Sequence, residues 1–323
     1  MTHLIPKIVI LFVLFLGTTA HATPLVHEPI RPIPLHMGAL DPEMVALGER
    51  LFHDTRLSKD GTLSCASCHP VDDGGMDGTQ VSVGINGQKG GINAPTVLNA
   101  GYNLAQFWDG RAASLEAQAV GPVTNPIEMG ASWEGVFKRL GQDKALVKTF
   151  RVLFPKQGMT KASIAQAIAT YERTLITPNA PFDQYLRGDK NAVTQDVKEG
   201  YQLFKSYGCV ACHQGINVGG NMYQTFGLFG DYFKTRDFPV SVSDFGRFNV
   251  TGQEEDRYAF KVPSLRNIGL TAPYFHDGTV NSLDLAVQIM ARYQLGRRLN
   301  EDQVLKIVAF LHSLTGTQPE APQ

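Results

Sequence analysis

The chain of 323 residues has few cysteines, no large excess of one charge and, beyond its start, no long hydrophobic run. Its formal net charge of −1 gives no basic footprint for nucleic acid, which argues against that class of partner. The apolar run from Ile8 to Leu16 follows Lys7 and is too short to span a bilayer, which takes about 20 residues. With Ala20-His21-Ala22 behind it, this run predicts a signal peptide over residues 1–22. We therefore expect an exported, periplasmic protein without a membrane span.

All four cysteines belong to two copies of the pattern Cys-x-x-Cys-His. The copies are Cys65-Ala66-Ser67-Cys68-His69 and Cys209-Val210-Ala211-Cys212-His213. This pattern attaches c-type haem, because two thiols on one tight turn can reach both vinyl groups of a porphyrin while the histidine ligates the iron. Disulfides would not require a histidine after each pair, and a four-cysteine zinc site would have to close over the whole intervening chain. The sequence therefore predicts two c-type haems.

The sequence around the two motifs repeats, which predicts two similar domains. Gly48-Glu49-Arg50-Leu51-Phe52 precedes the first motif, and Gly200-Tyr201-Gln202-Leu203-Phe204 precedes the second. An amphipathic helical segment follows each motif, over residues 161–175 and 300–314, the second with Asn300 as its N-cap. A helix, a haem motif and a second helix are the plan of a small cytochrome c domain. We expect an all-α fold with long loops and two cytochrome c-like domains, residues 23–183 and 184–323.

The ligand on the side of each iron opposite the motif histidine decides what the haem can do. A methionine there suits electron transfer, whereas an open side permits chemistry on a small molecule. Met290 lies shortly before the closing helix, where small cytochromes c place their ligand, whereas Met222 is too near His213 to reach round the porphyrin. We therefore expect Met290 on the second iron. In the first half, Met129 could close the iron, or its neighbour Glu128 could move protons at an open iron; the spacing leaves both interpretations open.

Four long blocks resemble the bacterial dihaem cytochrome c peroxidases, a family that has the methylamine-utilisation protein MauG as a relative. The blocks cover residues 90–99, 106–112, 260–267 and 272–278, within a resemblance that runs from Leu47 to Gly316. The resemblance implies that the first haem acts on hydrogen peroxide. It also implies an electron donor that is a small periplasmic cytochrome c or cupredoxin. Family members are commonly dimers, which makes a homodimer an expectation to test.

The resemblance further implies a role for individual residues. Glu128 falls on the family's catalytic acid/base and Gln118 on a glutamine near it, which makes Met129 a packing residue. Trp108 falls on the tryptophan between the haems, and Met290 on the methionine of the electron-transferring haem. The family also binds one calcium ion through an asparagine side chain and two backbone carbonyls, a donor set that suits this hard cation. The calcium residues map to Asn93, Thr271 and Pro273.

One position departs from the family's pattern. Many members carry a histidine in the loop before Gln88-Lys89-Gly90 that closes the peroxide haem until the other haem is reduced, and this chain has Ile85 there. An aliphatic side chain cannot ligate iron, so we expect the first haem to be open in the fully oxidised protein. Another histidine could substitute, and the candidates by elimination are His53, His276 and His312.

The leading prediction is therefore a periplasmic cytochrome c peroxidase that needs no reductive displacement of a distal histidine. The nearer alternative is a MauG-like oxidase that modifies a partner protein, although MauG has a tyrosine where this chain has Met290. The alternative from another functional class is a dihaem electron carrier, in which Met129 ligates the first iron and closes that haem.

Overall fold

The computed structural model describes residue 25, residues 27–36 and residues 38–319. The expected signal peptide, residues 1–22, lies outside the described residues. Within them, no helix combines the length and the apolar character needed to cross a membrane.

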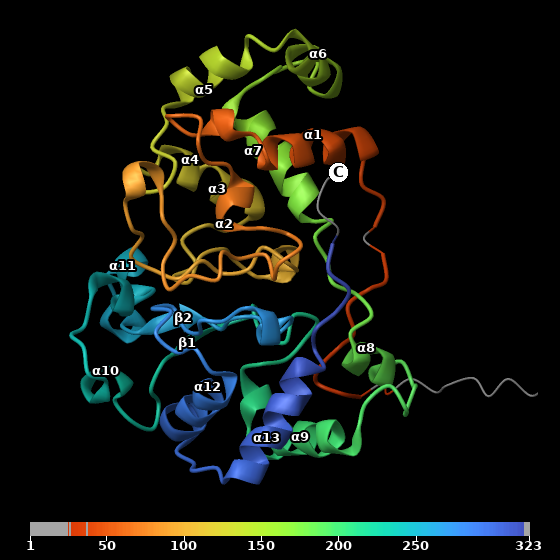
Figure 1. Cartoon of the computed structure of the whole chain (residues 1–323), viewed down its shortest axis with the longest axis vertical. Coiled ribbons are helices and arrows are strands. Elements are labelled where there is room, and N and C mark those ends of the chain that lie inside the picture. Colours follow the sequence, from red (N-terminus) through yellow and green to blue (C-terminus); the bar gives the residue numbers. More distant parts are fainter. Residues whose placement is uncertain (1–24, 26, 37, 320–323) are drawn as a thin grey trace, which may run out of the picture.

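Helices make up most of the regular structure and form two groups along the chain (Figure 1). The first group is α1 (Pro42–Phe52), α2 (Cys65–Cys68), α3 (Leu115–Ala119), α4 (Gly121–Thr124), α5 (Trp133–Leu140), α6 (Lys144–Leu153) and α7 (Lys161–Glu172). The second group is α8 (Pro181–Leu186), α9 (Gln195–Ser206), α10 (Tyr232–Thr235), α11 (Phe248–Thr251), α12 (Leu283–Ile289) and α13 (Glu301–His312). Short 3₁₀ turns connect them: η1 (Thr55–Leu57), η2 (Ile85–Gly87), η3 (Ala100–Tyr102), η4 (Cys209–Ala211), η5 (Val242–Phe245), η6 (Glu254–Asp256) and η7 (Ile268–Leu270), with one π-helical turn, η8 (Met290–Gln294).

The prediction of an all-α fold is confirmed in its coarser form, a mostly helical chain with long loops. The departure is a two-stranded antiparallel ribbon of β1 (Tyr223–Thr225) and β2 (Ala259–Lys261), in which Tyr223 lies opposite Lys261. Three residues per strand are too few to show the alternation that identifies a strand in a sequence. In Figure 1 this ribbon lies between the two groups of helices.

Both predicted closing helices are present. The segment 161–175 forms α7, which ends at Glu172 and begins with a capping box between Thr160 and Ser163. The segment 300–314 forms α13, and the Asn300 side chain accepts a 2.9 Å hydrogen bond from the backbone N–H of Gln303. Asn300 is therefore the N-cap that the sequence predicts.

The repeated glycine of each half lies where two helices touch. α1 packs along α7 in the first half, and α9 packs along α13 in the second. A Cβ atom on Gly48 would collide with the carbonyl oxygen of Ala167, and one on Gly200 would collide with that of Lys306. The internal repeat in the sequence therefore corresponds to the same close helix pair, built twice.

Each half has a hydrophobic core of its own. Leu51, Phe150 and Ile168 lie in the first core. The second contains Phe182 and the other hydrophobic residues that α8, α9, α12 and α13 bury, together with Ile30 from the segment before α1. The segment before α1 therefore packs with the second half, although it comes first in the sequence. The boundary at residues 183 and 184 stays a prediction.

A buried ion pair attaches this N-terminal segment to the second half. The Arg266 guanidinium donates to the carboxylate of Asp183 at 2.7 Å and to the backbone carbonyl of Arg31 at 2.8 Å. The Asp183 carboxylate also accepts from the backbone N–H of Ile33 at 3.2 Å. Because both partners of the pair are fully buried, the attachment is shielded from solvent.

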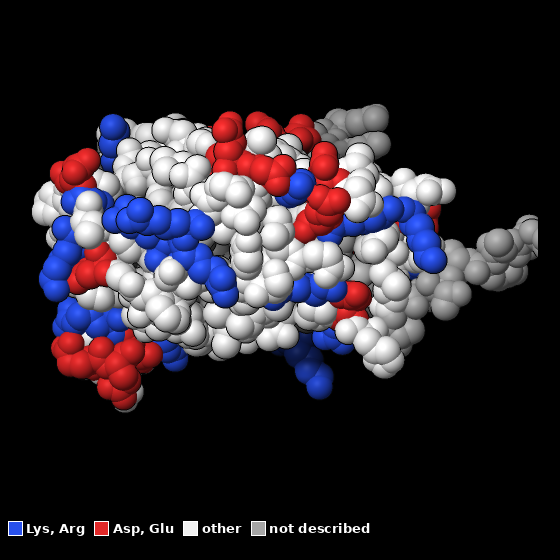
Figure 2. Space-filling model, turned by 90° about the horizontal axis from the view of Figure 1, so that it is seen from below, with Lys and Arg blue, Asp and Glu red and all other residues white. Residues whose placement is uncertain are grey.

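The surface mixes both signs of charge. Figure 2 views the molecule from below, the end of Figure 1 where α9, α12 and α13 lie, and shows lysines and arginines beside aspartates and glutamates. This mixture agrees with the nearly neutral net charge.

Candidate functional site

The first Cys-x-x-Cys-His motif forms one helical turn, α2, and its histidine is oriented by the backbone. The backbone N–H of His69 bonds to the carbonyl of Cys65 at 3.0 Å, and His69 Nδ1 lies 3.1 Å from the carbonyl oxygen of Gly75. Because a carbonyl only accepts, Nδ1 must carry the proton, which leaves the lone pair on Nε2. Burial lowers the pKa of His69, which favours the neutral ring that a metal needs.

The second motif repeats this arrangement on the turn η4. His213 Nδ1 lies 3.2 Å from the carbonyl oxygen of Val218, and the backbone N–H of His213 donates to the carbonyl oxygen of Cys209 at 2.9 Å. Burial lowers the pKa of His213 to about 4. All four cysteines are free thiols, so the structure contains no disulfide that competes with thioether bonds. The donor set of each motif therefore fits one covalently attached haem.

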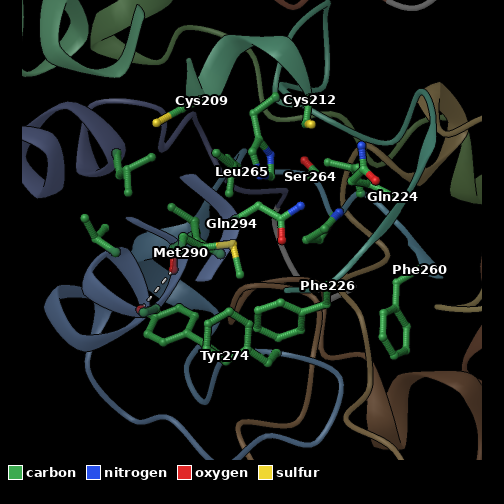
Figure 3. Close-up of a pocket in the computed structure, with 18 of the residues that line it drawn as sticks. Cys209, Cys212, Gln224, Phe226, Phe260, Ser264, Leu265, Tyr274, Met290 and Gln294 are labelled. Carbon is green, nitrogen blue, oxygen red and sulfur yellow. Dashed lines mark hydrogen bonds between the residues drawn. The ribbon is translucent and has the colours of Figure 1, made fainter. Parts of the chain in front are cut away.

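A large cavity opens beside the second motif, and Met290 lies in its wall. Figure 3 shows Cys209 and Cys212 on one side of the cavity and the Met290 side chain directed into it from the other. Met290 is the first residue of the π-helical turn η8, a type of turn that is frequent at functional sites. Met222, in contrast, does not line this cavity. The structure thus brings His213 and Met290 to one cavity, as the expected ligand pair requires.

Glu128 lies in a second pocket, which fewer residues line, beside the first motif. The pocket is lined by Phe107, Arg111, Ala112, Ala117, Gly121, Pro122, Asn125 and Glu128. Burial raises the pKa of Glu128, although a 2.6 Å hydrogen bond from the Asn125 amide and the charge of Arg111 act in the opposite direction. The pKa of Cys68 is raised by burial first and also by the charge of Glu128. This carboxyl group is therefore near the first attachment site and titrates above its ordinary range.

The partner of Glu128 is Asn125, which the sequence analysis did not single out. Gln118 lies half-buried on α3, outside the pocket, and its amide makes no hydrogen bond to Glu128 in the described part of the chain. The Asn125-Pro126 dipeptide is a turn signal, and the Asn125 side chain does close that turn by accepting from the backbone N–H of Ile127 at 3.2 Å. That signal could have drawn attention to Asn125.

Met129 and Ile85 both pack into apolar surroundings. Met129 is 4% exposed and belongs to the first core, which agrees with a packing role. Ile85 is also buried, and a Cβ on Gly130 would collide with the end of its side chain. The loop carrying Ile85 is further attached to the Glu128 turn by a 3.1 Å hydrogen bond from the Gln88 amide to the carbonyl of Pro126.

The three other histidines considered for the first iron lie in different surroundings. His276 belongs to the second half, where its Nε2 lies 2.7 Å from an Asp244 oxygen and its ring stacks on Phe260. His312 is exposed in the last turn of α13. His53 caps α1, and its buried Nε2 has no hydrogen-bond partner among the described residues. Only His53 belongs to the first half.

Trp108 and the three expected calcium residues all line the large cavity. The Trp108 indole N–H donates to the carbonyl oxygen of Asn93 at 2.9 Å. The Asn93 amide nitrogen donates to two backbone carbonyls, of Thr79 at 2.9 Å and Gln80 at 3.3 Å. Asn93 therefore has a fixed side-chain orientation, and Thr271 and Pro273 share the cavity wall with it.

Asp244, His276 and Asp277 come close enough together to suggest a metal site, but an arginine already pairs with both carboxylates. Arg236 forms ion pairs with both carboxylates, at 2.5 Å to Asp244 and 3.3 Å to Asp277. Burial alone would raise the pKa of Asp244, but hydrogen bonds from His276, Arg236 and Ser241 hold it well below its ordinary range. This cluster is therefore an ion-pair network.

Comparison with known proteins identifies the family. Residues 42–191 match the sequence model described as di-haem cytochrome c peroxidase. The chain is 50% identical to Cytochrome c551 peroxidase of Nitrosomonas europaea, over 91% of this chain and 86% of that protein. It is also 50% identical to Cytochrome c peroxidase Ccp of Escherichia coli, over 90% of this chain, but it spans only 62% of that relative's length.

The fold has a solved counterpart at lower identity. A MauG-like protein associated with microbial copper homeostasis superposes with a TM-score of 0.76 at 29% identity, covering 90% of this chain and 94% of the other. In sequence, this MauG-like protein is thus a more distant relative than the two bacterial peroxidases. On these similarities, which extend over nine tenths of its length, the chain belongs to the di-haem cytochrome c peroxidase family.

Proposed function

We propose that this protein reduces hydrogen peroxide to water with two electrons from a small redox protein. The observation that carries the proposal is Glu128, a carboxyl group with a raised pKa in a pocket beside the first haem motif. The overall reaction consumes one hydrogen peroxide, two protons and two electrons and forms two waters. It therefore needs a group that accepts and returns protons as well as a source of electrons.

The chain's own residues have separate tasks at the first site. Cys65 and Cys68 would hold the haem, and His69 would ligate its iron through Nε2, with Nδ1 held by the Gly75 carbonyl. The bound haem supplies a redox-active iron. Glu128 takes a proton from one peroxide oxygen and returns it to the leaving oxygen, the general acid/base role. Gln118 stays a proposed assistant, by resemblance, whereas the Asn125 amide is the group that orients Glu128 in the structure.

The second site is proposed to supply electrons. His213 and Met290, which both line the large cavity, would close the iron of the haem that Cys209 and Cys212 attach. Trp108 lies in the wall of this cavity on the loop that also contributes Phe107 and Arg111 to the Glu128 pocket. We assign Trp108 to the electron path between the haems by resemblance, and a loop whose residues line both pockets supports this assignment.

Ile85 supports a first haem that is open without prior reduction. The position where many family members have a ligating histidine carries a buried aliphatic side chain. We also propose, by resemblance, that one calcium ion binds near Asn93, Thr271 and Pro273, and that the protein works in the periplasm with a cytochrome c or cupredoxin donor.

A peroxide assay with reduced cytochrome c tests the proposal. Glu128→Gln should lower kcat by about 10²–10⁴-fold while two haems remain bound. Glu134→Gln, which changes an exposed carboxyl group on α5, serves as the matched control and should leave the rate unchanged. Near-normal turnover of Glu128→Gln would exclude the acid/base role. No peroxide reduction by a wild-type protein with two low-spin haems would favour the electron carrier instead.

A further inference from the structure

Lys261 is a buried cation without an acidic partner. It lies on β2 and is only 5% exposed. None of the described residues forms an ion pair or side-chain hydrogen bond with its ammonium group. Burial lowers the pKa of Lys261 to about 8, and no neighbouring charge opposes this effect. A charge removed from water in this way is costly unless a counter-charge meets it.

The cavity beside the second haem motif lacks that counter-charge. Lys261 is the only lysine or arginine among the described residues that line it, and no aspartate or glutamate lines it. The remaining wall is mostly apolar, with neutral amides such as Gln224 and Gln294 (Figure 3). A cavity with one cation and no anion is suited to an occupant that brings negative charge.

Lys261 lies at the junction between the two halves. Its backbone N–H donates to the carbonyl oxygen of Trp108 at 2.8 Å. The preceding residue, Phe260, meets the Trp108 ring edge-on at a centroid distance of 6.4 Å. Opposite Lys261 in the ribbon, the Tyr223 hydroxyl donates to the carbonyl of Gly110 at 3.5 Å. The buried cation therefore lies on the side of the cavity that faces the first half.

We propose that Lys261 forms an ion pair with a propionate of the haem in this cavity and thereby raises the reduction potential of that haem. The inference rests on the proposed binding of the second haem. A haem carries two propionates, which are the anions that the cavity wall lacks. A cation held beside it favours the reduced state, which has one positive charge fewer, and the effect is strong where water is excluded. Lys261 is thus a positioning residue for electron transfer.

Potentiometric titration of the purified holoprotein tests this proposal. Lys261→Met removes the charge and keeps the length of the side chain, and Lys261→Arg keeps the charge. Lys234→Met is the matched control, because Lys234 is an exposed lysine of the same half, with a side chain 84% exposed. The potential of the second haem should fall in Lys261→Met, return towards wild type in Lys261→Arg, and stay unchanged in Lys234→Met.

Two results would overturn the proposal. One is a second-haem potential in Lys261→Met that equals that of Lys234→Met. The other is a shift confined to the first haem, which would assign the ion pair to the other haem's propionate. Lys261→Gln provides a second neutral variant if the methionine variant does not fold. Haem content is measured in parallel, and peroxide turnover is not part of this test. If the protein holds two haems but reduces no peroxide, the proposed function is wrong, whereas the effect of Lys261 on the potential can still be measured.

Discussion

The backbone N–H of Ile85 donates a 2.8 Å hydrogen bond to the carbonyl oxygen of Glu128. This bond attaches the glycine-rich loop to the turn that carries the proposed acid/base. It uses only backbone atoms, so a different side chain at residue 85 can be introduced without removing it. The side chain, in contrast, decides whether this loop can supply a ligand to iron.

Ile85→His should convert the first site to one that requires reductive activation. An imidazole at this position can ligate the iron, whereas the native side chain cannot. The oxidised variant should show a new low-spin signal in its EPR spectrum, and its peroxide turnover should start only after prior reduction. Ile85→Val, which keeps an aliphatic side chain, is the control and should behave as wild type. A bis-histidine low-spin signal for the first haem already present in oxidised wild type would contradict the open-site hypothesis.

Asn125→Ala should move the acid limb of the pH profile to higher pH. The Asn125 amide donates to Glu128 and so stabilises its carboxylate, which partly opposes the effect of burial on the pKa of Glu128. Without the amide, the carboxyl group keeps its proton to higher pH, and the deprotonated form that accepts a proton from peroxide is lost earlier on acidification. The measurement is kcat/KM against pH. A limb that stays in place or moves to lower pH would show that this hydrogen bond does not tune the active group.

Glu172 should make the protein less stable as the pH rises from about 4.5 to about 8. Burial raises its pKa from 4.5 to about 8, and its Oε2 has no hydrogen-bond partner among the described residues. A folded-state pKa above the unfolded one contributes stability that is fully present below pH 4.5 and is lost as the pH rises through 8.

Glu172→Gln should remove much of this pH dependence, because the amide is neutral throughout. Thermal midpoints of the holoprotein at pH 5 and pH 8 provide the measurement. The variant should gain more relative to wild type at pH 8 than at pH 5. The exposed Glu255→Gln is the control. If the thermal midpoints of wild type and Glu172→Gln change equally between pH 5 and pH 8, Glu172 is not the cause of the pH dependence.

Gly200→Ala should destabilise the second half, although helix propensity alone predicts the opposite. Alanine in place of glycine favours a helix by about 1 kcal/mol. Here the added methyl group would collide with the Lys306 carbonyl of α13, and overpacking of this kind costs about 1–3 kcal/mol. The thermal midpoint of the holoprotein should therefore fall. Gly135→Ala is the control, since a Cβ atom there would meet only the ends of two side chains, those of Arg139 and Ser132, both 3.2 Å away. An equal fall in that variant would show that the contact between α9 and α13 is not the cause.

The features that the sequence predicted well have strong local signals. The two haem motifs are complete pentapeptides, and α7 and α13 both begin at clear capping boxes. The expectation for Met290 rests on the limited range of positions after the motif from which a ligand can come, and Met290 does line the cavity beside Cys209 and Cys212. Each of these signals depends on residues close together in the chain or on a fixed separation.

The features that were missed depend on contacts between distant segments. Lys261 stands in a family block, but nothing in its neighbours indicates that its ammonium group is buried without an anion. Nor could composition reveal that residues 29–33 belong with the second half, because that follows from Arg266 and Asp183. Such placements require the tertiary structure.

The attachment of the N-terminal segment has a consequence for the order of assembly. Residues 29–33 leave the ribosome early, yet their binding site exists only after Asp183 and Arg266 have been synthesised. Both haem motifs precede Arg266 in the chain, so both have been synthesised before this last contact can form. The first described segment of the chain therefore completes its packing only after the segments that carry both haem motifs have been made.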